Sequence, residues 1–103
     1  MPEPYAISAE AQDDLDGIAL YGTESYSVER ILDYDAELHR AFERLALFPD
    51  SGRTVPGLRD GVKALVVLQH IVFYRPRPRP VSIVRVMHQR ADWIAALTSQ
   101  PQN

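Results

Sequence analysis

The side chains best suited to binding or chemistry gather in the last third of this chain, where cationic residues follow two β-rich segments. These cations are Arg75, Arg77, Arg79, Arg85 and Arg90. A nucleic-acid groove would place aromatic side chains between such charges, so that bases could stack on them. Only Phe73, Tyr74 and Trp93 are near, and strand alternation can bury some of them. The pattern therefore does not favour direct nucleic-acid binding, and it suits an acidic protein segment as well.

The three histidines give no sign of a metal site. His39, His70 and His88 form no i,i+4 pair and no ligand set, and the chain has no cysteine. We therefore expect no metal, no cofactor and no small-molecule ligand. His39 is expected to face solvent, and His70, which opens a strand, to make a structural hydrogen bond. His88 is either functional or orders the C-terminal turn through a hydrogen bond.

Charge is divided unevenly along the chain. Residues 1–51 carry 12 acidic and 3 basic side chains, whereas residues 52–103 carry 2 acidic and 8 basic ones. Such asymmetry indicates that the second half meets an anionic partner. The alternative is internal, with an acidic helical layer neutralising a basic sheet. Trp93, in the polar tail, either caps the edge of the core or anchors a partner.

Length and composition predict one domain over residues 1–103, with a disordered tail at 98–103. A chain of 103 residues with 46% hydrophobic content can bury a real core. The N-terminal segment has neither a cationic start nor an apolar run, and no segment reaches the length of a membrane span. We expect a cytoplasmic protein without membrane contact.

Two amphipathic helices are predicted in the first half, after a short strand at 3–8. Ser8 is the N-cap expected for a helix over 9–23, and Ser27 is the N-cap expected for a longer second helix. The first helix carries an apolar stripe of Ala11, Leu15, Ile18 and Gly22, and the second carries Ile31, Tyr34, Leu38, Phe42 (or Ala41), Leu45 and Phe48. Tyr21 and Tyr34 are expected in the helix–sheet core. Turn residues at 49–52 end the second helix.

Three strands are predicted in the second half. Residues 62–68, 71–75 and 81–87 are rich in Val, Ile and Phe, and a proline-punctuated turn separates the last two. The element order is β-α-α-β-β-β, with room for a short terminal helix near 91–97. The fold class is α+β, with an antiparallel helical hairpin packed on a small, mainly antiparallel sheet.

Short motifs in a fixed order resemble those of the ParE-like toxins of the ParE/RelE superfamily, and the resemblance covers about residues 5–92. The motifs are Tyr5-x-x-Ser8, Ala11, Asp14-Leu15-x-x-Ile18-x-x-Tyr21, Tyr34-x-x-x-Leu38, Leu45-x-x-x-Pro49, Gly52-Arg53, Leu58-Arg59-x-Gly61, His70-x-x-Phe73-Tyr74-Arg75 and Val84-Arg85-Val86-Met87-His88-Gln89-Arg90. The apolar approach to His70 and the Arg-Pro turn at 75–80 depart from the family's pattern.

The resemblance implies a toxin of a type II toxin–antitoxin system, neutralised by a ParD-like antitoxin protein. Its implied target is DNA gyrase, through the A subunit with DNA, and the toxin would stabilise the cleaved enzyme–DNA complex without cutting anything itself. It is therefore not expected to be an enzyme. The expected target surface is cationic and comprises Arg85, His88, Arg90 and Trp93. In the competing account, Arg85 pairs with an acid of the helical layer.

A second interpretation is a ribosome-dependent mRNA endoribonuclease similar to RelE, in which cations stabilise the charge that develops on the scissile phosphate. Three residues of those relatives are missing here. Ile71 stands where they carry an arginine, Gln89 stands about where another carries one, and no tyrosine follows Tyr74. A third interpretation is a binding module without toxicity.

Overall fold

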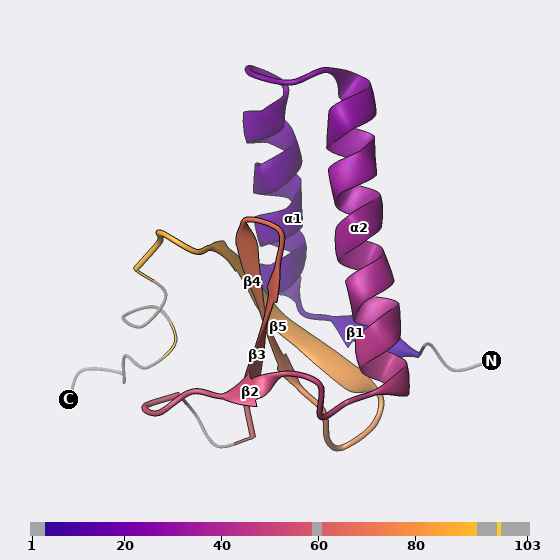
Figure 1. Cartoon of the computed structure of the whole chain (residues 1–103), viewed down its shortest axis with the longest axis vertical. Coiled ribbons are helices and arrows are strands. Elements are labelled where there is room, and N and C mark those ends of the chain that lie inside the picture. The colour runs from indigo at the N-terminus through magenta and orange to yellow at the C-terminus, as the bar shows by residue number, and fades with distance from the viewer. Residues whose placement is uncertain (1–3, 59–60, 93–96, 98–103) are drawn as a thin grey trace.

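A five-stranded sheet and a helical hairpin make up the fold in the computed structural model, which describes residues 4–58, 61–92 and 97. The elements are β1 (Tyr5–Ile7), α1 (Ala9–Gly22), α2 (Val28–Leu47), β2 (Arg53–Thr54), β3 (Lys63–Val67), β4 (His70–Arg75) and β5 (Val81–His88). The strand order is β1-β5-β4-β3-β2, and only the β1–β5 pair is parallel. Both helices cover one face of the sheet and extend beyond it (Figure 1).

The predicted α+β class is confirmed, with one addition to the element order. β2 was not predicted, because two residues that pair with Ala64 and Lys63 leave no periodic signal in the sequence. Most of the helix predicted near 91–97, the tail predicted at 98–103 and Trp93 lie outside the described residues.

Serine caps begin both helices, as predicted. The Ser8 hydroxyl accepts a hydrogen bond from the Ala11 backbone N–H at 3.0 Å and donates one to the Val84 carbonyl at 2.9 Å. The Ser27 hydroxyl accepts from the Arg30 N–H at 3.2 Å. These bonds satisfy N–H groups that the first turn of a helix leaves free. Ser8 in addition fastens the start of α1 to β5.

The core lies between the helical stripe and the sheet. Leu15, Leu38, Phe42 and Leu45 are buried, and Ile18 and Tyr34 pack against them in part. The sheet contributes Leu65, Val67, Val72, Tyr74, Val81, Ile83 and Val86 to this cluster. A second cluster contains Val62, Ala64, Ile71, Phe73 and Leu97. Because successive residues of a strand point to opposite faces, β4 is buried on both faces, which explains its continuous apolar run.

Tyr74 fastens the segment after α2 to the sheet. Its buried hydroxyl donates to the Pro49 carbonyl and accepts from the Gly52 N–H, both at 2.8 Å. A Cβ at position 52 would lie 2.6 Å from this hydroxyl and 2.7 Å from the Ala64 carbonyl oxygen. Only glycine fits so close an approach, and the sequence uses one there.

Three expectations about the helices were wrong. Tyr21 is 82% exposed and not part of the core, because α1 extends beyond the sheet at that point. Phe48, the last member of the second stripe, is the C-cap of α2 and is exposed. His39 is half-buried, and its Nδ1 atom is hydrogen-bonded to the Tyr5 hydroxyl at 3.1 Å.

Candidate interaction groove

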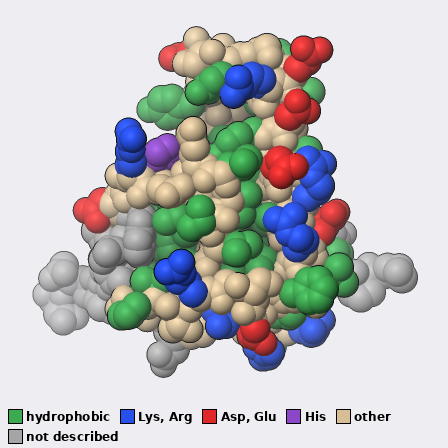
Figure 2. All heavy atoms as spheres, in the orientation of Figure 1, with side chains coloured by type: hydrophobic (Ala, Val, Ile, Leu, Met, Phe, Trp, Pro, Cys, Tyr) green, Lys and Arg blue, Asp and Glu red, His purple; other side chains and the backbone are tan. Residues whose placement is uncertain are grey.

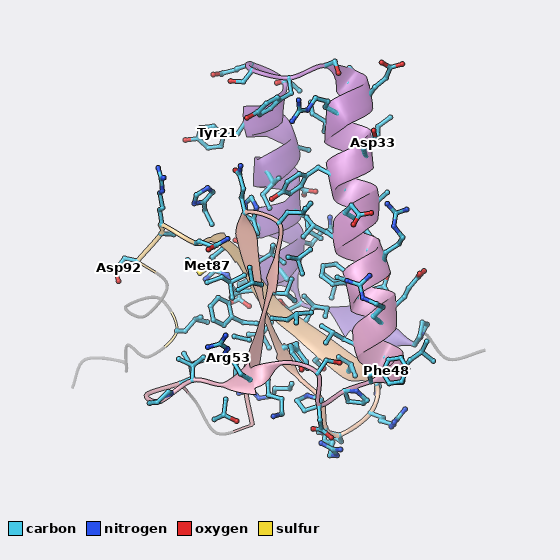
Figure 3. All side chains as sticks on the ribbon, in the orientation of Figure 1. Tyr21, Asp33, Phe48, Arg53, Met87 and Asp92 are labelled. Carbon is cyan, nitrogen blue, oxygen red and sulfur yellow. The ribbon has the colours of Figure 1, made fainter. Side chains whose placement is uncertain are left out.

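An apolar groove opens where the projecting helices meet the β3–β4 turn and the end of β5. Its volume is about 600 Å³. The apolar and aromatic side chains that line it come from both helices, from the turn between them and from β5: Leu15, Ile18, Tyr21, Tyr26, Ile31, Tyr34, Leu38, Val86 and Met87. Tyr21 projects from α1 on the side where Met87 and Asp92 lie (Figure 3). Hydrophobic side chains and a histidine reach the surface beside the projecting helices (Figure 2).

A chain of hydrogen bonds joins α2 to the sheet at the base of this groove. The Tyr34 hydroxyl accepts from the Gln69 backbone N–H at 3.1 Å and lies 2.6 Å from His70 Nδ1. Burial raises the pKa of Tyr34, although the hydrogen bond from Gln69 acts in the opposite direction. Burial also lowers the pKa of His70; His88 lowers it further, while Asp14 acts the other way. Both side chains are therefore neutral near pH 7.

His70 and His88 face each other across β4 and β5. They are directly opposed in the antiparallel register, and their ring centroids are 5.3 Å apart. A β-bulge in β5 sets this pairing. Near the turn Arg75 pairs with Ser82, but between Tyr74 and Phe73 the register shifts by one residue, because β5 has one residue more than β4 there. Without the bulge, Met87 would lie opposite His70. Both histidines line the groove.

The Asp14 carboxylate joins α1 to β5 beside the histidines. It accepts two hydrogen bonds from the Arg85 guanidinium, at 2.8 and 2.9 Å, and one from the Val86 backbone N–H at 2.9 Å. The Arg85 and Asp14 side chains are 27% and 15% exposed. This bond raises the pKa of Arg85. β1 pairs with β5 only up to Ile83, so Asp14 occupies a strand edge that would otherwise be open.

The turn after β5 is fastened to the β3–β4 turn. His88 Nδ1 accepts a hydrogen bond from the Arg90 backbone N–H at 3.0 Å. The Gln89 side chain donates to the Leu68 carbonyl at 2.9 Å, and its backbone N–H donates to the Gln69 carbonyl at 3.1 Å. The Arg90 side chain is exposed. The position of His88 and Arg90 is therefore set by backbone contacts.

The arginines of the second half do not form one surface. Arg85 is paired with Asp14 on α1, and Arg77 in the β4–β5 turn is paired with Asp50 at 3.0 Å. Lys and Arg side chains gather at the lower end of the view in Figure 2, which is the end of the β4–β5 turn. Part of the charge asymmetry is therefore neutralised internally, as the second of the two sequence interpretations expected.

Of the predicted surface residues, His88 and Arg90 lie together at the exposed end of β5, and Arg85 makes the internal pair that the competing account described. Trp93 lies outside the described residues. The structural hydrogen bond predicted for His70 is confirmed, as is the ordering bond of His88. Sequence reasoning missed Asp14 and the joint placement of Tyr34, His70 and His88. The motif around Asp14 was the signal available for the first.

In the described part of the chain, no group of three or more His, Cys, Asp or Glu side chains could hold a metal ion. The same residues include no helix that is long and apolar enough to cross a bilayer.

Comparison with known proteins places these features in a family. Residues 5–93 match the profile of the family described as the ParE toxin of the type II toxin–antitoxin system parDE. The chain is 39% identical over 87 residues to Toxin ParE1 of Caulobacter vibrioides, covering 84% of this chain and 90% of that protein. It is 31% identical over 101 residues to Toxin ParE of Escherichia coli, covering 93% and 94%.

A solved structure shares the fold. It belongs to a chromosomal ParDE toxin–antitoxin system from P. aeruginosa, and it aligns with a TM-score of 0.71 at 19% identity. The alignment covers 82% of this chain and 92% of that one.

Proposed function

The chain belongs to the ParE toxin family of type II toxin–antitoxin systems, and we propose that it arrests growth by inhibiting DNA gyrase until a ParD-like antitoxin neutralises it. The match of the family profile to residues 5–93 carries this proposal. In this proposal the toxin acts by binding: it stabilises the cleaved complex of gyrase and DNA and cuts no nucleic acid itself.

The buried position of Ile71 supports a function without phosphodiester cleavage. Ribonuclease relatives resemble this chain but carry an arginine there, and here the side chain is apolar, 9% exposed and packed in the second core cluster. An arginine at this position would have to leave the cluster to reach a phosphate. Ribonuclease activity would therefore have to use other cations.

We place the antitoxin in the groove and along the sheet edge. An apolar groove between helices suits the apolar face of an amphipathic helix, and an exposed strand edge suits an added strand. Two aromatic side chains of the groove lining, Tyr21 and Tyr26, are exposed, and the same stretch of chain exposes Leu20, Val28 and Leu32. A helix and a strand together would bury more than roughly 1,200 Å².

The gyrase-contacting surface in this proposal is the exposed end of β5, formed by His88 and Arg90; Trp93, predicted for the same surface, lies outside the described residues. Arg85 would support it by holding β5 against α1 through Asp14. Arginine makes bidentate contacts with anionic groups, which suits an acidic gyrase surface or its bound DNA. His88 lines the groove as well as the gyrase-contacting surface. An antitoxin segment in the groove would therefore cover His88 and block the contact with gyrase, which would neutralise the toxin.

Purified gyrase tests the function directly. We expect the wild-type toxin to inhibit supercoiling and to accumulate cleaved DNA, and expression without antitoxin to stop growth and induce the DNA-damage response while mRNA stays intact. Arg90→Ala should weaken gyrase inhibition, and Arg79→Ala, an exposed arginine at the opposite end of β5, is the matched control. Rapid ribosome-dependent cleavage of transcripts, with unchanged gyrase activity, would refute this proposal and favour the endoribonuclease interpretation.

Hydrogen exchange tests the antitoxin site. In the complex, residues 9–48 and the strands should gain protection relative to the free toxin. Complex formation with no added protection in either region would place the antitoxin elsewhere on the molecule.

A further inference from the structure

The base of the groove carries two imidazole rings whose protons are placed by their partners. The Arg90 backbone N–H can only donate, so the His88 Nδ1 atom that it contacts is an acceptor, and the proton of the neutral ring is on Nε2. The Gln69 N–H likewise donates to the Tyr34 oxygen, and His70 Nδ1 lies 2.6 Å from the same hydroxyl. When the phenol donates its proton to His70 Nδ1, His70 also carries its ring proton on Nε2.

In these tautomers each ring has one N–H, at Nε2, that it can offer to a ligand in the groove, and the two ring planes meet at 78°. The rings are 5.3 Å apart and directly opposed across two strands, and their Nε2 atoms have no hydrogen-bond partner among the described residues. A carboxylate has two oxygens that accept hydrogen bonds, so one carboxylate can accept from both rings. Ile18, Ile31 and Met87 are apolar members of the same lining.

We propose that His70 and His88 form a two-donor site for one carboxylate side chain of the antitoxin segment that occupies the groove. This inference rests on the proposed function, because it assigns a chemical contact to the partner named there. The segment would place apolar side chains against the groove walls and a single Asp or Glu at its base.

The groove's charge favours a peptide over a nucleic acid. Asp13, Asp14 and Asp35 line it, while Arg30 is the only Lys or Arg among the described lining residues. Asp14 is occupied by Arg85, and Asp35 lies 3.7 Å from His39. A continuous row of phosphates would be repelled by this set. A peptide can instead present one acid to the histidines and bases to Asp13 and Asp35.

The contact is expected to use neutral rings. A proton on His88 Nδ1 would be incompatible with its bond from the Arg90 N–H, and burial lowers the pKa of His70. The titratable and charged groups near the pair are Asp13 and Asp14 on α1, Tyr34, Arg30 and Asp35 on α2, and Arg85 and Arg90 in and just after β5. A neutral donor can be replaced by an amide, which gives a sharp test.

Histidine ring ¹⁵N spectra of the free toxin test the tautomers and the anion preference without any partner. At pH 7.5 we expect the Nε2–H form for His70 and His88, and saturable shifts of both rings with sodium acetate but not of His39. The Nδ1–H form at either ring, or acetate shifts no larger than those of His39, would overturn the site. Tighter binding of inorganic phosphate than of acetate would assign it to a phosphate ligand instead.

Binding of the antitoxin encoded beside this toxin tests the contact itself. His88→Leu should weaken binding about tenfold to hundredfold, the range expected for a lost hydrogen bond to a charged group. His88→Gln keeps a donor near the Nε2 position and should restore most of the affinity. His39→Leu, a half-buried histidine outside the groove, is the control. Equal antitoxin affinity for all three variants would refute the contact between His88 and the antitoxin carboxylate, while leaving the antitoxin in the groove. Absence of growth arrest on expression would instead refute the proposed toxin function, and it would leave the acetate binding of the two histidines unaffected.

Discussion

The ion pair of Arg85 and Asp14 is expected to stabilise the fold, and Arg85 is not expected to contact gyrase directly. Arg85→Ala removes two charge-assisted hydrogen bonds, at 2.8 and 2.9 Å. Each is worth about 1.5–3 kcal/mol, but the side chains are 27% and 15% exposed, so water replaces part of the loss. We expect a net loss of about 2–3 kcal/mol in the free energy of unfolding. Asp14→Ala should cost about 1 kcal/mol more, because the Val86 N–H loses its acceptor as well.

Urea denaturation followed by circular dichroism measures these losses. A loss of about 2–3 kcal/mol should lower the urea midpoint by about 1–2 M in a domain of this size. Arg90→Ala is the matched control, since its side chain is exposed, and its midpoint should stay at the wild-type value. The double variant should show a coupling of about 1–2 kcal/mol between the two positions. A wild-type midpoint for Arg85→Ala, together with lost toxicity, would refute the structural role and return Arg85 to the target surface.

Three further outcomes are expected. Phe42→Ala, at a fully buried position, should cost about 2–5 kcal/mol, whereas exposed Leu32→Ala should leave the melting temperature unchanged. Gly52→Ala should lower the melting temperature, because its Cβ would lie 2.6 Å from the Tyr74 hydroxyl; an unchanged value would show that the loop relaxes freely. Because the folded-state pKa of His70 is lowered, the unfolded chain binds more protons below about pH 6.5, so stability should fall with falling pH until the folded pKa is passed. His70→Asn should flatten that slope in urea midpoints between pH 5 and 8.

Much of the fold could be predicted because its signals are local. Ser8 and Ser27 cap helices through bonds to residues three positions ahead, and Leu38, Phe42 and Leu45 share one helical face whatever they pack against. Tyr21 shows the limit of such signals. It continues the apolar face of α1, but the sheet does not reach that far, and only the relative lengths of the helices and the sheet decide that it is exposed.

The charge pattern left two possibilities open that only the packing resolved. An excess of acids in the helices and of bases in the strands allows both an internal pairing and an external surface. Contact between α1 and β5 brings Asp14 to Arg85, 71 positions away, while Arg90 stays exposed beyond the end of the strand. The two arginines are only five positions apart but differ in role, because Arg85 contacts a helix and Arg90 faces solvent.

By itself, the sequence determined the two helices, the three longer strands and the residues that fill the core. The base of the groove depended on tertiary structure. One extra residue on β5, at the bulge beside Tyr74, moves the register so that His88 rather than Met87 lies opposite His70. The side-chain period of a strand is two, so a shift by one residue exchanges the faces of all the residues beyond it. Hydrophobic alternation in β5 does not reveal such a shift. The shift is seen only when β5 is paired with β4; the Ser8 hydroxyl donates a hydrogen bond to the carbonyl of Val84, the extra residue.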